Sequence, residues 1–196
     1  MKVVIVDYGS GNIASVKMAL SRLGHEAILS NREDEIYAAD KVIFPGVGHA
    51  KAAMQQLKYH KLDEVIPKLT QPLLGICLGM QLMCSHSEEG STEALGIFDA
   101  PVQQFPPHPE FKVPHMGWNL IETRSLGANH AQIELPGYVY FVHSYFVPLH
   151  ANTTALANYI VPFSAALQRD NFFATQFHPE KSGSLGAQIL QNFLKL

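Results

Sequence analysis

A cysteine between two glycines is the residue best suited to covalent chemistry in this chain. The segment Gly75-Ile76-Cys77-Leu78-Gly79 follows an apolar run typical of a strand and precedes an apolar run typical of a helix. This pattern predicts a nucleophile elbow, a tight turn that exposes the nucleophile, with cysteine in the place of serine. The helix N-terminus would favour the thiolate, and the N–H of Leu78 would face a developing oxyanion. A structural cysteine packed between glycines fits the same segment, so the elbow needs support from other residues.

A cysteine nucleophile needs a base, and the chain offers ten histidines. Two segments, His108-Pro109-Glu110 and His178-Pro179-Glu180, place a histidine and a glutamate two residues apart, which puts both side chains on one face of a strand end. The first segment lies in the proline-rich stretch 105–114, an expected loop, whereas the second follows a strand-like run at 172–177. We therefore expect Cys77, His178 and Glu180 to form a triad of nucleophile, base and orienting carboxylate. His108 is expected to be a solvated loop residue, and Cys84, without flanking glycines, a buried thiol.

A glycine-rich segment near the N-terminus raises a different class of function. Gly9-Ser10-Gly11-Asn12-Ile13-Ala14 lies between an expected strand and an expected helix and satisfies the dinucleotide-binding fingerprint. Glu33 and Asp34 fall near the position of a ribose-binding acid. An NAD-binding Rossmann-like domain is thus the alternative, but it has no use for an elbow cysteine with a histidine–glutamate pair, so we favour a glycine turn at a sheet edge. A non-catalytic binding protein, the third possibility, would be favoured by an incomplete triad, and this triad is complete.

The elements that must position these residues alternate between strand and helix in the first half of the chain. Continuous apolar runs predict buried parallel strands at 2–6, 42–44 and 73–76. Helical spacing follows each run, at 13–23, 53–57 and 78–84. Apolar runs at 138–142 and 154–157, with little helix between them, predict antiparallel or mixed strands, and an amphipathic helix at 185–193 follows. We expect residues 1–196 to form a single α/β domain with an open, mostly parallel or mixed sheet flanked by helices.

The composition argues against several other classes of protein. The formal charge is -3, without the basic patch that binding to nucleic acid or an acidic membrane surface requires. No apolar stretch approaches the roughly 20 residues that cross a bilayer. The histidines and cysteines lack metal-ligand spacing, so no metal is expected. Two cysteines, too far apart along one helix for a disulfide, fit a reducing compartment, and we expect a cytoplasmic protein.

Six segments together resemble the class I glutamine amidotransferases, over essentially the whole chain. They are Asp7–Asn12, Pro45–Gly48, Gly75–Gln81, Pro114–Asn119, His143–Tyr145 and Gln176–Ser182. The elbow and the His-Pro-Glu segment are shared across the class. The first segment and His-Met-Gly-Trp-Asn single out the glutaminase subunits of imidazole glycerol phosphate synthases. The resemblance implies a flavodoxin-like fold.

The resemblance also implies a reaction and the residues that carry it. Cys77 would attack the side-chain amide of L-glutamine, His178 would pass the thiol proton to the leaving ammonia, and water would hydrolyse the cysteinyl thioester. A backbone N–H of Val47–Gly48 would complete the oxyanion hole with Leu78. The implied glutamine contacts are Gln81, Ser144 and Tyr145. The implied partner-facing residues are Asn12, Met116, Trp118, Asn119 and Lys181.

The implied partner is a separate cyclase subunit of the (β/α)8-barrel type, which forms a heterodimer with the glutaminase. It receives ammonia through an internal channel and makes imidazole glycerol phosphate and aminoimidazole carboxamide ribonucleotide (AICAR), the first of them for histidine biosynthesis. No metal or organic cofactor is implied. The sequence leaves open whether the ammonia goes instead to another synthase of the same type.

Overall fold

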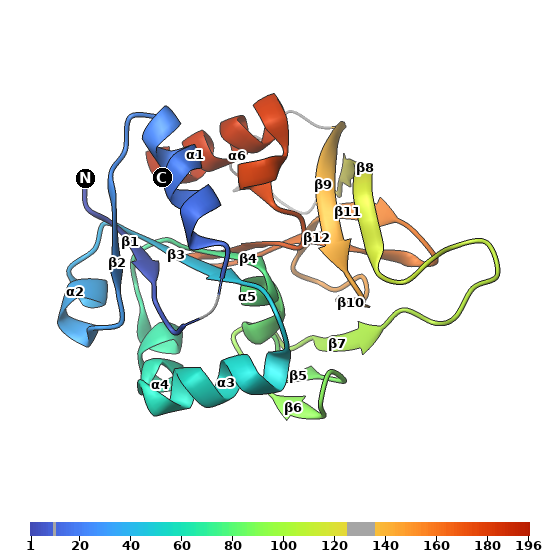
Figure 1. Cartoon of the computed structure of the whole chain (residues 1–196), viewed down its shortest axis with the longest axis horizontal. Helices are drawn as coiled ribbons and strands as arrows, with labels where there is room; N and C mark the ends of the chain where they lie inside the picture. Colours follow the sequence, from blue (N-terminus) through green and yellow to red (C-terminus); the bar gives the residue numbers. More distant parts are fainter. Residues whose placement is uncertain (10, 125–135) are drawn as a thin grey trace.

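A nine-stranded mixed sheet forms the centre of the computed structural model, which describes residues 1–9, 11–124 and 136–196 (Figure 1). Its strands, in spatial order, are β2 (Ala27–Ser30), β1 (Val3–Val6), β3 (Lys41–Gly46), β4 (Leu73–Cys77), β13 (Phe172–Thr175), β12 (Pro162–Arg169), β11 (Thr153–Asn158), β8 (His115–Thr123) and β9 (Gly137–His143). The first five pair in parallel, and the remaining pairs are antiparallel. The predicted mixed α/β sheet flanked by helices is confirmed.

Helices cover both faces of the parallel half. On one face lie α1 (Ile13–Arg22) and α6 (Gly183–Lys195), and on the other lie α3 (Ala50–Tyr59), α4 (Leu62–Val65) and α5 (Leu78–Leu82) (Figure 1). The remaining short helical elements are α2 (Glu33–Tyr37) and the 3-10 turns η1 (Ile66–Lys68) and η2 (Pro179–Lys181). This double cover explains the apolar run of β1: Val4 and Val6 pack with α3, while Val3 and Ile5 pack with α1 and α6.

Three parallel strands end side by side at the edge of the sheet where the chemistry was expected. In the register of the sheet, Gly46 of β3 is paired with Cys77 of β4, and Thr175 of β13 is paired with Ile76. The peptide Val47–Gly48, the start of α5 and the segment after Thr175 therefore leave the sheet at one place. Functional residues of open α/β folds commonly gather at the carboxyl ends of such strands.

Two of the expected elements end earlier than the sequence indicated. The helix after Cys77 ends at Leu82 and not near Cys84, because the carbonyls of residues 82–84 accept hydrogen bonds from residues 95–98 of the returning chain. The last strand ends at Thr175, so the expectation that His178 and Glu180 share a strand end is wrong. Glu180 lies in the turn η2, since Pro179 has no N–H to continue a strand ladder. The proline-rich stretch 105–114 is the expected loop.

A small second sheet was not predicted at all. Its strands, in spatial order, are β10 (Tyr145–Phe146), β7 (Pro101–Gln104), β5 (His86–Ser87) and β6 (Thr92–Glu93). Pairing of β10 with β7 brings the chain after β9 against the segment that follows α5. This sheet forms one side of the site described below.

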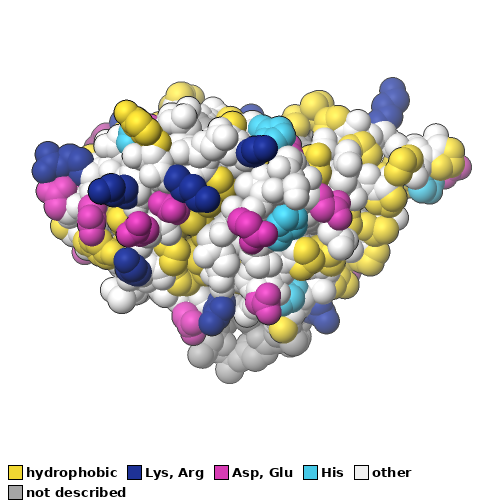
Figure 2. Space-filling model, turned by 90° about the horizontal axis from the view of Figure 1, so that it is seen from below, with side chains coloured by type: hydrophobic (Ala, Val, Ile, Leu, Met, Phe, Trp, Pro, Cys, Tyr) yellow, Lys and Arg dark blue, Asp and Glu magenta, His cyan; other side chains and the backbone are white. Residues whose placement is uncertain are grey.

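The surface adds little to the functional argument. Figure 2 shows acidic and basic side chains interspersed over the face that it views. Within residues 1–9, 11–124 and 136–196, no helix is both long and apolar enough to span a membrane. The same residues contain no cluster of three metal-binding side chains. Both cysteines are free, as expected. Ser10 of the glycine-rich segment lies outside the described residues.

Candidate active site

The predicted elbow is present at Cys77. This residue joins β4 to α5 with φ 54° and ψ -109°, a conformation that non-glycine residues rarely adopt. The flanking glycines are required by close packing. A Cβ on Gly79 would overlap the carbonyl oxygen of Phe44, and one on Gly75 would overlap the sulfur of Met83. The turn therefore holds Cys77 at the end of the sheet in a fixed, strained geometry.

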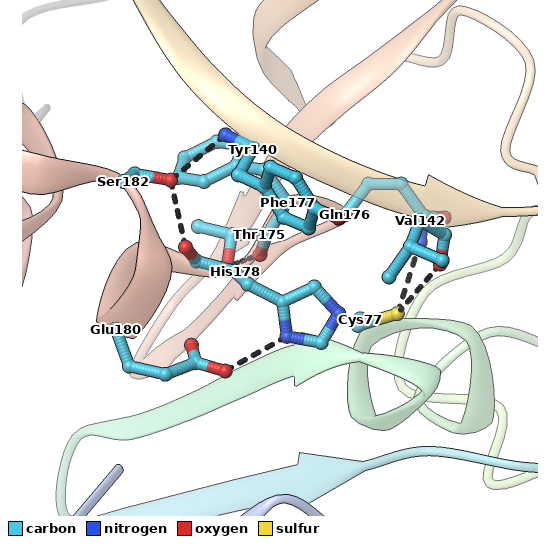
Figure 3. A network of polar contacts seen from close by, with 9 residues as sticks. All are labelled: Cys77, Tyr140, Val142, Thr175, Gln176, Phe177, His178, Glu180 and Ser182. Atoms are coloured by element: carbon cyan, nitrogen blue, oxygen red, sulfur yellow. Dashed lines mark hydrogen bonds and ion pairs between the residues drawn. The ribbon is translucent and has the colours of Figure 1, made fainter. Parts of the chain in front are cut away.

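His178 lies between Glu180 and Cys77 (Figure 3). Its Nδ1 is 2.8 Å from Oε1 of Glu180, and the two side chains are only 2% and 1% exposed. Because Nδ1 faces a carboxylate, it carries a proton. Nε2 is therefore the ring nitrogen that can exchange a proton with Cys77. Nε2 of His178 and Oε2 of Glu180 are buried without a hydrogen-bond partner among the described residues. An imidazole held in one tautomer beside a thiol is the arrangement that a general base needs.

The surroundings of His178 favour its protonated form. Burial disfavours the charged imidazolium, but Cys77 and Glu180 favour it more strongly and raise the pKa of His178 to about 10. Ser182 stabilises the turn η2 that follows His178. Its Oγ donates to the carbonyl of His178 at 2.7 Å and accepts from the N–H of Tyr140 at 3.0 Å. Ser182 was not assigned a role from the sequence.

The sulfur of Cys77 has two further polar neighbours. Its S–H donates to the carbonyl of Val142 at 3.9 Å, and Nε2 of Gln176 lies 3.7 Å from it (Figure 3). Both neighbours come from strands or strand ends that reach the same edge as β4. Neither was singled out from the sequence, because a backbone carbonyl leaves no signal in a residue pattern and Gln176 was quoted only within a motif.

A cavity of about 320 Å³ opens over Cys77. Its lining residues are Val47, Gly48, Cys77, Leu78, Gln81, Glu89, Pro114, Val142, His143, Ser144, Tyr145 and His178. The structure thus brings together the candidate nucleophile and base, the candidate oxyanion residues and the candidate glutamine contacts. Glu180 lies behind His178. His108 is in the exposed loop, where its Nδ1 accepts from the N–H of Glu110 at 3.2 Å.

Glu89 is the lining residue that sequence reasoning missed. It follows β5 in a turn of the small sheet, and its Oε2 accepts from the N–H of Ala50 at the start of α3, at 2.6 Å. The carboxylate is the acidic group of the cavity lining. Nothing distinguished Glu89 from its neighbour Glu88 in the sequence, because only the fold of residues 85–104 carries it to the site.

The five candidate partner-facing residues do not share one surface. Met116 and Trp118 lie on the exposed face of β8, 63% and 56% exposed. Nζ of Lys181 lies 5.9 Å from the ring of Tyr140, on which the ring of Trp118 also packs edge to face at 6.1 Å. Asn119 is on the opposite face of β8, where its amide donates to the carbonyl of Asn158 at 2.8 Å. Asn12 precedes α1, the helix that packs against the turn η2, which contains Lys181.

Comparisons with known proteins show the family to which the chain belongs. The family model of glutamine amidotransferase class-I matches residues 4–196. The chain is 55% identical to imidazole glycerol phosphate synthase subunit HisH of Bacteroides fragilis over 199 residues. It is 56% identical to the protein of that name from Bacteroides thetaiotaomicron and 49% identical to that from Pectobacterium atrosepticum. Each alignment covers 100% of both chains.

Solved structures agree in fold. A crystal structure of a glutamine amidotransferase matches with a TM-score of 0.74 at 18% identity, covering 98% of this chain and 97% of that one. A glutamine amidotransferase from Thermotoga maritima matches with a TM-score of 0.60 at 17% identity, covering 100% of this chain and 83% of that one. With the family model matched from residue 4 to the last residue, the chain belongs to the class-I glutamine amidotransferases.

Proposed function

We propose that this chain is the glutaminase subunit of an imidazole glycerol phosphate synthase, which hydrolyses L-glutamine to glutamate and ammonia. The observation that carries the proposal is the buried ion pair of His178 and Glu180. Nε2 of His178 has no hydrogen-bond partner among the described residues and faces Cys77, and both residues line a cavity large enough for an amino acid. The relatives named above support the choice of pathway. In this proposal residues 1–196 act as one domain, without metal or organic cofactor, in the cytoplasm.

The reaction follows from the three side chains. Nε2 of His178 takes the proton of Cys77 to give a thiolate–imidazolium pair, in which the raised pKa of His178 keeps the proton on the imidazole. The thiolate then attacks the carbonyl carbon of the glutamine side chain. The N–H of Leu78 and an N–H of the Val47–Gly48 peptide stabilise the oxyanion. The imidazolium then gives its proton to the leaving ammonia, and Glu180 stabilises that charged form throughout. A water molecule, deprotonated by His178, hydrolyses the γ-glutamyl thioester and releases glutamate.

The opposite side of the cavity offers groups for the amino-acid end of the substrate. Gln81 is held with its amide nitrogen 2.9 Å from the carbonyl of Tyr145, and the Ser144–Tyr145 backbone lines the cavity beside it. The carboxylate of Glu89 is suited to the α-ammonium group, because an ionic hydrogen bond to a charged amine is stronger than a neutral one. Glutamine would thereby lie with its side-chain amide toward Cys77.

The Val47–Gly48 peptide, a proposed donor to the oxyanion, is the proposed point at which activity is controlled. Gly48 has φ +97°, and because glycine adopts positive and negative φ about equally readily, the backbone at Gly48 can change conformation at low steric cost. With its N–H turned away, one oxyanion donor is missing, which costs roughly 10²–10³ in rate. Docking of the cyclase with its nucleotide would shift the peptide to the active orientation.

The proposed partner is a (β/α)8-barrel cyclase that forms a heterodimer with this chain and converts the ammonia. Met116, Trp118 and Lys181 form the most suitable docking surface, because exposed aromatic and apolar side chains commonly anchor interfaces. Asn12 and Asn119 remain proposed as flanking contacts.

One assay tests this function. Steady-state glutamine hydrolysis is measured for the chain alone, with its candidate cyclase, and with cyclase plus the cyclase's nucleotide ligand, while cyclisation is followed in parallel. We expect a nearly inactive chain, activation by cyclase and ligand, and imidazole glycerol phosphate formed at the expense of glutamine. If glutamine is hydrolysed but only a different synthase uses the ammonia, the alternative acceptor is correct. Saturable micromolar binding of NAD, with no glutamine hydrolysis under any condition, would support the alternative of an NAD-binding Rossmann-like domain.

A further inference from the structure

Gln176 is a buried polar residue in contact with the reacting sulfur. It follows β13, is 0% exposed, and its Nε2 lies 3.7 Å from Sγ of Cys77 (Figure 3). We propose that Gln176 is a further catalytic residue, which donates an N–H to the sulfur of Cys77 and thereby stabilises the thiolate over the thiol. The inference rests on the proposed function, in which that thiolate is the nucleophile.

The direction of this hydrogen bond is fixed by a backbone carbonyl. Nε2 of Gln81 lies 2.9 Å from the carbonyl oxygen of Tyr145 and 2.9 Å from Oε1 of Gln176. A carbonyl cannot donate, so Gln81 must present its NH₂ group, and both hydrogens are used. Gln176 must therefore turn its oxygen to Gln81 and its NH₂ group to Cys77. The reverse orientation would set two NH₂ groups against each other, so the assignment does not depend on an arbitrary choice of amide orientation.

The anchoring carbonyl is itself held in place. The oxygen of Tyr145 accepts a second hydrogen bond, from Nδ1 of His143 at 2.7 Å. With two donors on one carbonyl, the chain Tyr145–Gln81–Gln176 keeps its orientation before substrate arrives. The N–H of Gln176 is thus a preorganised donor, of the kind that stabilises developing charge at no cost of reorganisation.

The contact discriminates between the two forms of the sulfur. The thiol donates to the carbonyl of Val142 at 3.9 Å, and this interaction is lost with the proton. The N–H of Gln176 remains, and it becomes stronger because hydrogen bonds to an ionised acceptor are stronger than those to a neutral one. When the sulfur becomes a neutral thioester, the contact weakens again. The hydrogen bond from Gln176 therefore stabilises the thiolate of Cys77 more than the thiol or the thioester.

The test is the pH dependence of Cys77 alkylation by iodoacetamide in the isolated chain, with the modified residue identified by peptide fragmentation. Gln176→Met removes the donor and keeps a side chain of similar length, and Gln176→Leu is the second variant if Met disturbs folding. Thr175→Val is the matched control: it is isosteric, adjacent and buried, and its hydroxyl donates to the carbonyl of Phe177 at 3.1 Å and not to Cys77. Circular dichroism establishes folding.

Loss of a hydrogen bond to a charged group should raise the midpoint of the alkylation profile by about one pH unit. Below the midpoint the variant should react about tenfold more slowly than the wild type, and above it the two rates should converge, which a packing defect would not produce. Thr175→Val should keep the wild-type profile. A wild-type profile in a folded Gln176 variant would overturn the inference. Failure of glutamine to protect wild-type Cys77 from alkylation would instead contradict the proposed function, so the two failures are distinguishable.

Discussion

Nδ1 of His115 lies 3.0 Å from Nε2 of His143, between the paired strands β8 and β9. Nδ1 of His143 faces the carbonyl of Tyr145, so it carries the proton and Nε2 accepts from His115. Nε2 of His115 in turn lies 3.4 Å from the amide nitrogen of Asn119. Both rings are therefore neutral. Burial lowers the pKa of His115 to about 4 and that of His143 to about 3.

This pair should make stability depend on pH. An unfolded histidine has a pKa of about 6.5, so between that value and about 3 the unfolded state binds a proton that His143 in the folded state does not. Stability should accordingly fall as pH decreases below about 6.5. In His143→Gln, which can still donate to the carbonyl of Tyr145, the slope of unfolding free energy between pH 4.5 and 6 should be shallower by about 1.4 kcal/mol per pH unit. Guanidinium unfolding at several pH values measures it, and an unchanged slope would contradict a neutral buried His143.

The base is tested against the other histidine–glutamate segment. His178→Asn should lower cyclase-activated glutamine hydrolysis by about three orders of magnitude or more, because His178 is the base whose Nε2 faces Cys77. His108→Asn changes the same residue type in the exposed loop and should be close to neutral. The measurement is the steady-state rate of glutamine hydrolysis by each variant in the same complex. An inactive His108→Asn variant together with an active His178→Asn variant would contradict the assignment of His178 as the base.

The proposed ammonium contact has a matched control next to it. Glu89→Gln should raise KM for glutamine about tenfold or more with a smaller effect on kcat, because the charge interaction is present in substrate and transition state alike. Glu88, whose Oε2 accepts from the N–H of Gln104 at 2.7 Å, does not line the cavity, and Glu88→Gln should leave KM unchanged. Equal KM effects in both variants would argue for a general electrostatic role.

Trp118 is the only tryptophan of the chain, so its fluorescence reports on one surface. Addition of the cyclase should shift the emission of Trp118 to shorter wavelength, as its ring leaves water. Trp118→Ala should weaken association by about tenfold or more, the range of an aromatic interface anchor. Tyr59→Ala, at a 79% exposed position on α3, is the control. An unshifted emission in a complex with a tryptophan-free cyclase would exclude this surface.

The elbow and the parallel half of the fold could be predicted because their signals are local. Cys77 needs close-packed glycines on both sides, and strands covered on both faces are apolar throughout. The sequence correctly predicted that His178 and Glu180 lie close together, but it placed both at a strand end. Spacing alone does not distinguish a strand end from a turn at Pro179.

What could not be predicted depends on long-range register. The strands β5, β6 and β10 are two residues long, too short for any periodicity. Glu89 reaches the cavity only through them. His115 and His143 are 28 residues apart and meet because the register of β8 and β9 pairs them, which no local pattern specifies. The contact of Gln176 with Cys77 spans 99 residues in the same way.

The central claim is that Cys77 becomes covalently glutamylated during turnover, and it can be tested directly. The complex of this chain with its cyclase and the cyclase's ligand is mixed with isotopically labelled glutamine, quenched in acid within the first turnovers, and analysed by peptide fragmentation. The account predicts a γ-glutamyl group on Cys77 and none on Cys84, which is fully buried in apolar surroundings that raise the pKa of its thiol. It also predicts no adduct in Cys77→Ala and a normal adduct on Cys77 in Cys84→Ala. Glutamine hydrolysis that continues in Cys77→Ala, or an adduct found on Cys84, would contradict it.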